Sequence, residues 1–232
     1  MATPGNHAAD RADSYAPLRE YAAIGDGRTI ALVALDGSID WLCLPDLDSP
    51  AALGALLDAG SGGGFALCPV SPFVAERRYL PGTNVLETTF RTSSGVARVF
   101  DAMTLPGRDL SPQREVVRAV EAVAGSVSMR WCLTPRFGFG SRPTRIGRRA
   151  GAPVATQGAD AVALCSWGAG GPELTVGSIG GVRCHRRGAG SVRAERCSPG
   201  TARDSQPTRR RAQTGGDGIG VAALVRKPAT WD

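Results

Sequence analysis

Residues 29–45, TIALVALDGSIDWLCLP, decide the fold class of this chain. Two runs of branched and aromatic residues flank the pair Asp36-Gly37, which suits a two-residue type I′ turn between antiparallel strands. In the second run, apolar side chains occupy both alternating sets of positions, and side chains of a strand alternate between its faces. We therefore expect a hairpin whose second strand is packed on both sides, at least from Trp41 to Leu44.

The same period of two returns in the runs downstream of this hairpin. Between 114 and 123, REVVRAVEAV has some helical propensity, but its branched residues and its neighbours favour a strand. Pro81-Gly82, Ser93-Ser94-Gly95 and Gly125-Ser126 resemble turns, at the spacing typical of β-sandwiches. The expected strands are FALCPV (65–70), FVAERRYL (73–80), NVLETTFRT (84–92), VARVFDAM (96–103), REVVRAVEAV (114–123) and SVSMRWCLTP (126–135), the last with Val127, Met129, Trp131 and Leu133 on one buried face.

Two segments interrupt this pattern. Residues 48–60, DSPAALGALLDAG, offer Ser49 as an N-cap, Pro50 at the first helical position and a glycine just past the end, so they predict one short helix. Residues 136–159 are rich in Gly, Arg and Pro and predict a long exposed loop. Residues 160–168 and 172–180 then predict two last strands.

The positive charge of the chain is confined to its last fifty residues. The formal net charge is +6, but residues 1–180 carry 16 Arg against 17 acidic residues, whereas residues 181–232 carry 11 basic residues against four acidic ones. The last segment shows neither helical nor strand periodicity, so we expect residues 181–232 to be a disordered, Arg/Gly-rich tail. Non-specific attraction to nucleic acid is the most that its Arg209-Arg210-Arg211 run indicates, so no specific nucleic-acid partner is expected.

Cysteine spacing and hydropathy indicate the cellular compartment of the protein. The six cysteines form no CxxC pair, and no apolar run of 18 residues occurs. Residues 1–14 are polar and predict a disordered N-terminus rather than a signal peptide. We therefore expect free thiols in a reducing cytoplasm and no membrane span.

Several strings of the sequence, taken in order, resemble one known family. They are YAAIGDGRTIALVALDGSIDWLCLPDLDSPAALGALLD, GGGFALCP, ERRYLPGTNVLETTFRTSSGVARVFDAM and REVVRAVEAVAGSVSMRWCLTPRFGFG. Together they resemble the N-terminal domain of bacterial glycoside hydrolase family 15 proteins, which are glucoamylase-like and trehalase-like. The resemblance runs from about residue 15 to residue 170. It departs at Asp46 and Leu47, where relatives usually have a basic residue followed by Phe.

The resemblance implies an all-β domain over residues 15–180, an antiparallel, supersandwich-like β-sandwich. In complete family members an (α/α)₆ barrel follows and holds the two glutamates of an inverting hydrolase, so this chain is expected to be a non-catalytic domain without its barrel. The parent reaction would be hydrolysis of α-glucosidic bonds, as in glucoamylase or trehalase. The alternative is a free-standing carbohydrate-binding β-sandwich module. Because the pattern ends abruptly, we interpret residues 175–185 as the site of a frameshift or a truncated gene model.

No catalytic residue, metal site or cofactor is predicted. If the hairpin and its following loop face the barrel, they would form part of a substrate-pocket rim, contacting an α-glucan or trehalose through Asp40, Trp41, Asp46, Asp48 and Ser49. Asp36 and Asp48 are also explained by turn and cap chemistry. Trp41 and Trp131 could stack on sugars, but their alternating apolar strands favour core packing.

The remaining motifs favour structural interpretations. GDGRT (25–29) lacks the ending of a phosphate loop and leads into a strand, so it predicts a turn. Cys184, His185 and Cys197 have irregular spacing for zinc. The chain has two histidines, one of them His7 in the N-terminal segment, which nearly excludes a Ser-His-Asp site.

Overall fold

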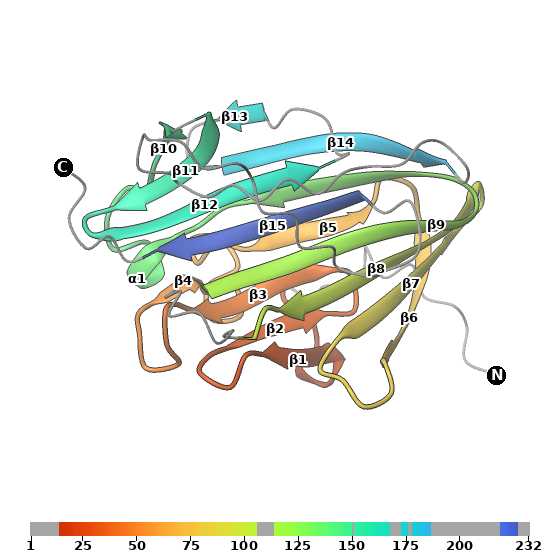
Figure 1. Cartoon of the computed structure of the whole chain (residues 1–232), viewed down its shortest axis with the longest axis horizontal. Helices are drawn as coiled ribbons and strands as arrows, with labels where there is room; N and C mark the ends of the chain where they lie inside the picture. The colour runs from red at the N-terminus through yellow and green to blue at the C-terminus, as the bar shows by residue number, and fades with distance from the viewer. Residues whose placement is uncertain are drawn as a thin grey trace, which may run out of the picture.

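The structure is a computed structural model that describes residues 14–105, 114–149 and 151–166, together with the backbone of residues 167, 173–175, 178–186 and 219–226. It is almost entirely antiparallel β-structure (Figure 1). A 3₁₀ turn, Leu18–Glu20, precedes the first strand. The strands are β1 Tyr21–Gly25, β2 Ile30–Ala34, β3 Ser38–Cys43, β4 Ala51–Leu53, β5 Phe65–Pro69, β6 Phe73–Tyr79, β7 Leu86–Thr92, β8 Gly95–Met103, β9 Arg114–Leu133, β10 Arg145–Arg149, β11 Ala152–Gln157, β12 Asp160–Trp167, β13 Glu173–Thr175, β14 Ser178–Arg186 and β15 Ile219–Arg226, with α1 at Phe137–Gly140.

Strand β9 organises the sheet, because it belongs to both of its halves. Its first arm, up to Gly125, pairs with β8 and β15. Its second arm, residues 126–133, pairs with β5 and β14. Gly125 has φ 63°, and a Cβ there would overlap the carbonyl oxygen of Ser94, so the bend between the arms requires glycine. In Figure 1, β9 doubles back at the right of the view.

The two halves of the sheet enclose one hydrophobic core. Strands β1–β5 with the second arm of β9 form one layer, and β6–β8 with the first arm and β12 form the other. Buried side chains of both layers belong to a single cluster, which includes Ile24, Phe65, Phe90, Val120 and Trp131. The predicted all-β antiparallel sandwich is therefore confirmed, as two layers joined into one curled sheet.

The hairpin at residues 29–45 is confirmed, but its turn is of another kind. The Gly37 amide donates to the carbonyl of Ala34 at 3.0 Å, and Gly37 alone in the turn has a positive φ, 89°. The type I′ prediction is wrong, because that turn requires positive φ at Asp36 as well. Leu35 and Asp36 instead occupy a turn that the left-handed glycine closes. Both faces of β3 are buried from Ile39 to Cys43, apart from the half-buried Trp41, as predicted.

The helix predicted over residues 48–60 is wrong. Residues 51–53 form β4, which is buried and pairs with β3, and residues 54–62 form a loop. Within this loop the Gly62 amide donates to the Asp58 carbonyl at 2.8 Å, and the Asp58 carboxylate accepts the Ser61 amide at 2.9 Å. Pairing and burial of the Ala-Ala-Leu segment outweigh the modest helical propensity of the run.

The loop predicted over residues 136–159 is also wrong, since the structure places α1, β10 and β11 there. The strand prediction for residues 114–123 and 160–168 is confirmed, whereas Gly125-Ser126 is a bend inside β9 and not a turn. Of the segment expected to be a tail, residues 181–186 and 219–226 lie in β14 and β15. The rest of that segment and residues 1–13 lie outside the described residues.

Gly37→Ala should destabilise the fold by at least about 3 kcal/mol, because a side chain there adds left-handed strain to an overlap with the carbonyl oxygen of Leu67. Gly82→Ala is the matched control. Gly82 has φ 68° but open space around it, so the expected cost is about 1 kcal/mol. Urea unfolding followed by circular dichroism measures both, and equal costs would contradict the close approach at Gly37.

Candidate functional site: the charged end of the hairpin

The predicted rim residues lie at one end of the sandwich but do not share one surface. Asp40 is buried in β3, and its Oδ2 accepts the Tyr21 hydroxyl at 2.7 Å. Trp41 points to the opposite face of the strand, where its ring lies 6.0 Å from that of Phe139. Asp48 is exposed. The prediction of a substrate rim stays untested, but Asp40 and Trp41 cannot line the same side of it.

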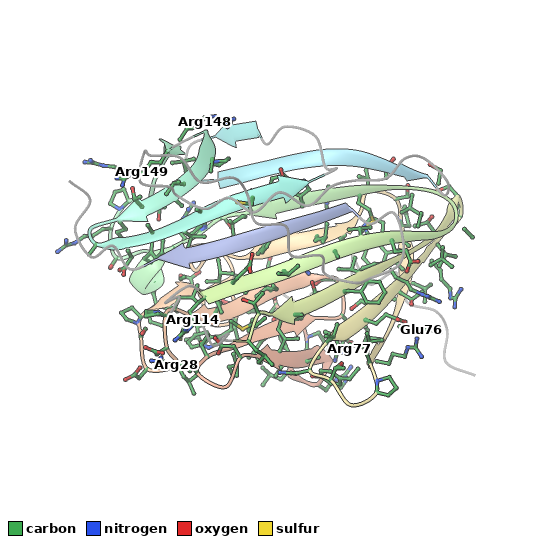
Figure 2. The ribbon with its side chains drawn as sticks, in the orientation of Figure 1. Arg28, Glu76, Arg77, Arg114, Arg148 and Arg149 are labelled. Atoms are coloured by element: carbon green, nitrogen blue, oxygen red, sulfur yellow. The ribbon has the colours of Figure 1, made fainter. Side chains whose placement is uncertain are left out.

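The loop after β3 is held by its own backbone and by two arginines. The Asp46 amide donates to the Ser49 hydroxyl at 3.2 Å, and the Ser49 amide donates to the Asp46 carbonyl at 3.0 Å. The Asp46 carboxylate lies 2.8 Å from Nε of Arg28 and 3.7 Å from Nη2 of Arg114. Arg28 and Arg114 lie on the same side of the molecule in Figure 2, at the end of the sandwich that carries this loop.

Arg114 also joins the turn before β2 to this loop. Its Nε donates to the carbonyl of Pro45 at 3.2 Å and lies 3.4 Å from the Asp26 carboxylate. The other oxygen of Asp26 accepts the amides of Arg28 and Thr29, each at 2.9 Å. The structural-turn prediction for GDGRT is therefore confirmed. We call Asp26, Arg28, Asp46 and Arg114 the charge cluster.

The buried carboxylates of the described residues all serve the fold. Asp101 forms an ion pair with Arg118, whose Nε is 2.8 Å from its Oδ1. Glu87 accepts two bonds from Arg78, at 3.0 and 3.1 Å. Together with Asp26 and Asp40, these are the acidic side chains buried in the part of the chain that the structure describes. Inverting hydrolysis needs two carboxyls about 6.5–9.5 Å apart across a sugar pocket, and these groups face protein donors instead.

The α1 segment presents an exposed aromatic ring that the sequence pattern did not reveal. Gly138 and Phe139 have left-handed dihedrals, with φ 54° and 60°, and Gly140 follows with φ 71°. Left-handed backbone is costly for a residue with a side chain, so Phe139 is strained, and the residue is 48% exposed. The signal available in the sequence is the pair of glycines on either side of it. Trp131, in contrast, is buried in the core, as predicted.

The cysteines of this region are free thiols. Cys43 is buried at the end of β3, and burial raises the pKa of its thiol. Cys132 on β9 is exposed. Within the described ranges, His, Cys, Asp and Glu side chains nowhere gather in the groups of three that a metal ion would need. The side chains of Cys184, His185 and Cys197 lie outside those ranges.

The described helical segments include none that is long and apolar enough to cross a membrane. The compartment of the protein stays a prediction.

Comparison with known proteins supplies the context for this end of the domain. Residues 11–172 match the family model described as "Trehalase-like, N-terminal". A trehalase of Mycolicibacterium smegmatis is 35% identical over 141 residues, which are 54% of this chain and 21% of that protein. A trehalase of Mycobacterium tuberculosis is 33% identical over the same shares. Trehalase 1 of Sulfolobus acidocaldarius is 36% identical over 118 residues, 50% of this chain and 19% of that protein.

The match therefore spans about a fifth of the length of these curated relatives. No solved structure matches the chain.

Asp26→Ala should cost about 2–4 kcal/mol of stability, because two backbone amides lose their acceptor and the buried Arg114 loses an ion-pair partner. Asp48→Ala, in the exposed part of the neighbouring loop, is the control and should change stability by less than about 0.5 kcal/mol. Chemical denaturation of both variants checks this, and a cost at Asp26 no larger than that at Asp48 would show that the charge cluster does not hold the loop.

Cys43 should react with iodoacetamide much more slowly than Cys132 in the folded protein. Its raised pKa keeps the thiol protonated to higher pH, and the thiolate is the nucleophile. Peptide mass spectrometry of samples alkylated at pH 7, 8 and 9 resolves the two sites. Equal rates in the native protein would contradict the burial of Cys43, and equal rates after denaturation serve as the control.

Proposed function

Because the chain belongs to the family of trehalase-like N-terminal domains, we propose that it is the non-catalytic N-terminal domain of a glycoside hydrolase whose catalytic domain lies outside this chain. One observation carries this proposal: the buried carboxylates of the described residues are all bound to structural donors, and no pair of them faces a sugar pocket. The four-fifths of each relative that this chain does not match leave room for the catalytic domain.

In this proposal the domain braces an (α/α)₆ barrel that hydrolyses an α-glucosidic bond with inversion, as in trehalase or glucoamylase. The end of the sandwich that carries the loop after β3 faces the barrel, where Trp41, Asp46, Asp48 and Ser49 shape the rim of its pocket. Asp40 is buried on the opposite face of β3 from Trp41 and supports the strand from within. Three features support this orientation. The loop after β3 is fixed by the charge cluster, Leu47 at its tip is 54% exposed, and the strained Phe139 ring lies beside Trp41.

The alternative is a free-standing carbohydrate-binding module. The exposed Phe139 ring beside Trp41 favours it, because sugars stack on aromatic faces. Against it, the other large exposed apolar side chains of the described residues are mostly aliphatic, such as Leu18, Leu47 and Leu57. Aliphatic side chains lack the aromatic face on which a sugar ring stacks.

The purified chain should release no glucose from trehalose or maltoheptaose, whereas a chimera should be active. In the chimera, residues 11–172 of this chain replace the matched segment of the Mycolicibacterium smegmatis trehalase. A bracing domain should preserve trehalose hydrolysis, and Trp41→Ala in the chimera should raise KM more than it lowers kcat if Trp41 lies at the rim.

One control variant accompanies Trp41→Ala. Trp131→Phe in the chimera changes a tryptophan that is buried in the core and should leave KM unchanged. Glucose release by the isolated chain would contradict a non-catalytic domain. A folded but inactive chimera would contradict the bracing role, and specific binding of maltoheptaose by the isolated chain would favour the carbohydrate-binding module.

A further inference from the structure

Strand β1 lies at one end of the sheet, and its outer edge is covered by side chains instead of by another strand. β1 pairs with β2, and the described strands include none on its other edge. β6 is the end strand of the opposite layer, since it pairs with β7 alone among the described strands. In Figure 1 the end of β6 reaches β1 at the lower right of the view.

Two side chains from the end of β6 and from the turn after it hold the carbonyls of β1. The hydroxyl of Tyr79 donates to the carbonyl of Ala23 at 2.7 Å. The side-chain amide of Asn84 donates to the carbonyl of Gly25 at 3.0 Å. Tyr79 is 45% exposed, so this hydrogen bond lies on the surface and not in the core.

Arg77 extends the same row of contacts to the beginning of β1. Its Nη1 donates to the carbonyl of Glu20, the residue before the strand, and to the carbonyl of Val33 on β2 at 3.2 Å. Figure 2 shows Arg77 at the same corner of the molecule, beside β1. We call Arg77, Tyr79 and Asn84 the edge strap.

The edge strap occupies the groups that another strand would need. In an antiparallel strand, the N–H and C=O of one residue point to the same edge, and successive residues alternate between edges. The carbonyls of Ala23 and Gly25 accept hydrogen bonds from β6 and its turn, so the amides of these two residues also point away from β2. A strand that paired with this edge would have to displace Tyr79 and Asn84.

The sequence of β1 offers no other protection against pairing. Its residues, Tyr-Ala-Ala-Ile-Gly, include no charge and no proline, which are the usual means of keeping an end strand from pairing with another chain. β10, the strand at the other end of the main strand order, carries three arginines among its five residues. Charge therefore protects β10, whereas β1 depends on side chains from β6 and its turn.

We propose that the edge strap prevents self-association, because it keeps β1 from pairing with the β1 edge of a second copy of this chain. An uncharged strand can pair antiparallel with its own copy without placing like charges opposite each other. The hydrogen bonds of Tyr79 and Asn84 must break in both copies before such a ladder forms. The proposal does not depend on the bracing role, since every contact of the edge strap lies within this chain.

Sedimentation velocity of the full 232-residue chain over a wide range of protein concentration tests the proposal. The double variant Tyr79→Phe with Asn84→Ala should dimerise at least about tenfold more tightly than the unchanged chain, because its β1 edge pairs without breaking these hydrogen bonds. Tyr79→Phe alone keeps the aromatic ring and should shift dimerisation in the same direction. Hydrogen exchange of residues 21–25 should slow in the associated double variant.

Glu76→Gln is the matched control, since Glu76 is an exposed residue of β6 whose carboxylate lies 3.9 Å from Arg91 on β7. It should leave dimerisation unchanged. Ala23→Pro, added to the double variant, should abolish the gained association, because it removes an amide that points to the outer edge and none from the β1–β2 ladder. Circular dichroism should show that all variants are folded.

Three results would overturn the proposal. The first is unchanged dimerisation in both Tyr79→Phe and the double variant. The second is an equal gain in Glu76→Gln, which would assign the effect to surface charge. The third is a gain that persists with Ala23→Pro, which would place the association at another surface.

Discussion

The buried guanidinium of Arg118 ties the two layers of the sandwich together. It lies on the first arm of β9, is 0% exposed, and binds the carboxylate of Asp101 on the neighbouring strand β8. Across the core, its Nη1 donates to the carbonyl of Phe65 at 2.6 Å, and its Nη2, which also donates to Asp101, donates to the carbonyl of Gly37 at 2.7 Å. The same group lies 5.0 Å from the centre of the Phe65 ring. The hairpin turn of one layer is thus bound to the central strand of the other.

This arrangement explains why the domain buries charged residues that have a structural role and no catalytic one. A buried guanidinium requires a full set of acceptors, and Asp101 with two carbonyls supplies them. The charge cluster is a second example of a buried arginine with acidic partners. At the start of β9, the guanidinium of Arg114 forms ion pairs with Asp26 and Asp46. The Asp46 carboxylate also pairs with Arg28 there.

The sequence was sufficient to predict the strands in which buried and exposed residues alternate strictly. The hairpin around Gly37 and both arms of β9 follow from local pattern, because burial of one face fixes the period. The sequence was insufficient where tertiary contacts determine whether a segment forms a strand. Residues 51–53 are strand because they pair with β3, and residues 145–157 form strands although Arg and Gly dominate the first of them. Arg118 could not be singled out, since its partners Phe65 and Gly37 are 53 and 81 residues away.

The most direct test of this account is a double-mutant cycle on the buried pair, with Arg118→Met, Asp101→Leu and the double variant compared by urea unfolding. Each single variant should lose about 3–5 kcal/mol, because it leaves one buried charge without its partner. The double variant should lose clearly less than the sum, with a coupling free energy of at least about 2 kcal/mol. Additive losses, or single losses below about 1 kcal/mol, would contradict the claim that Asp101 holds the guanidinium of Arg118 in place between the two layers.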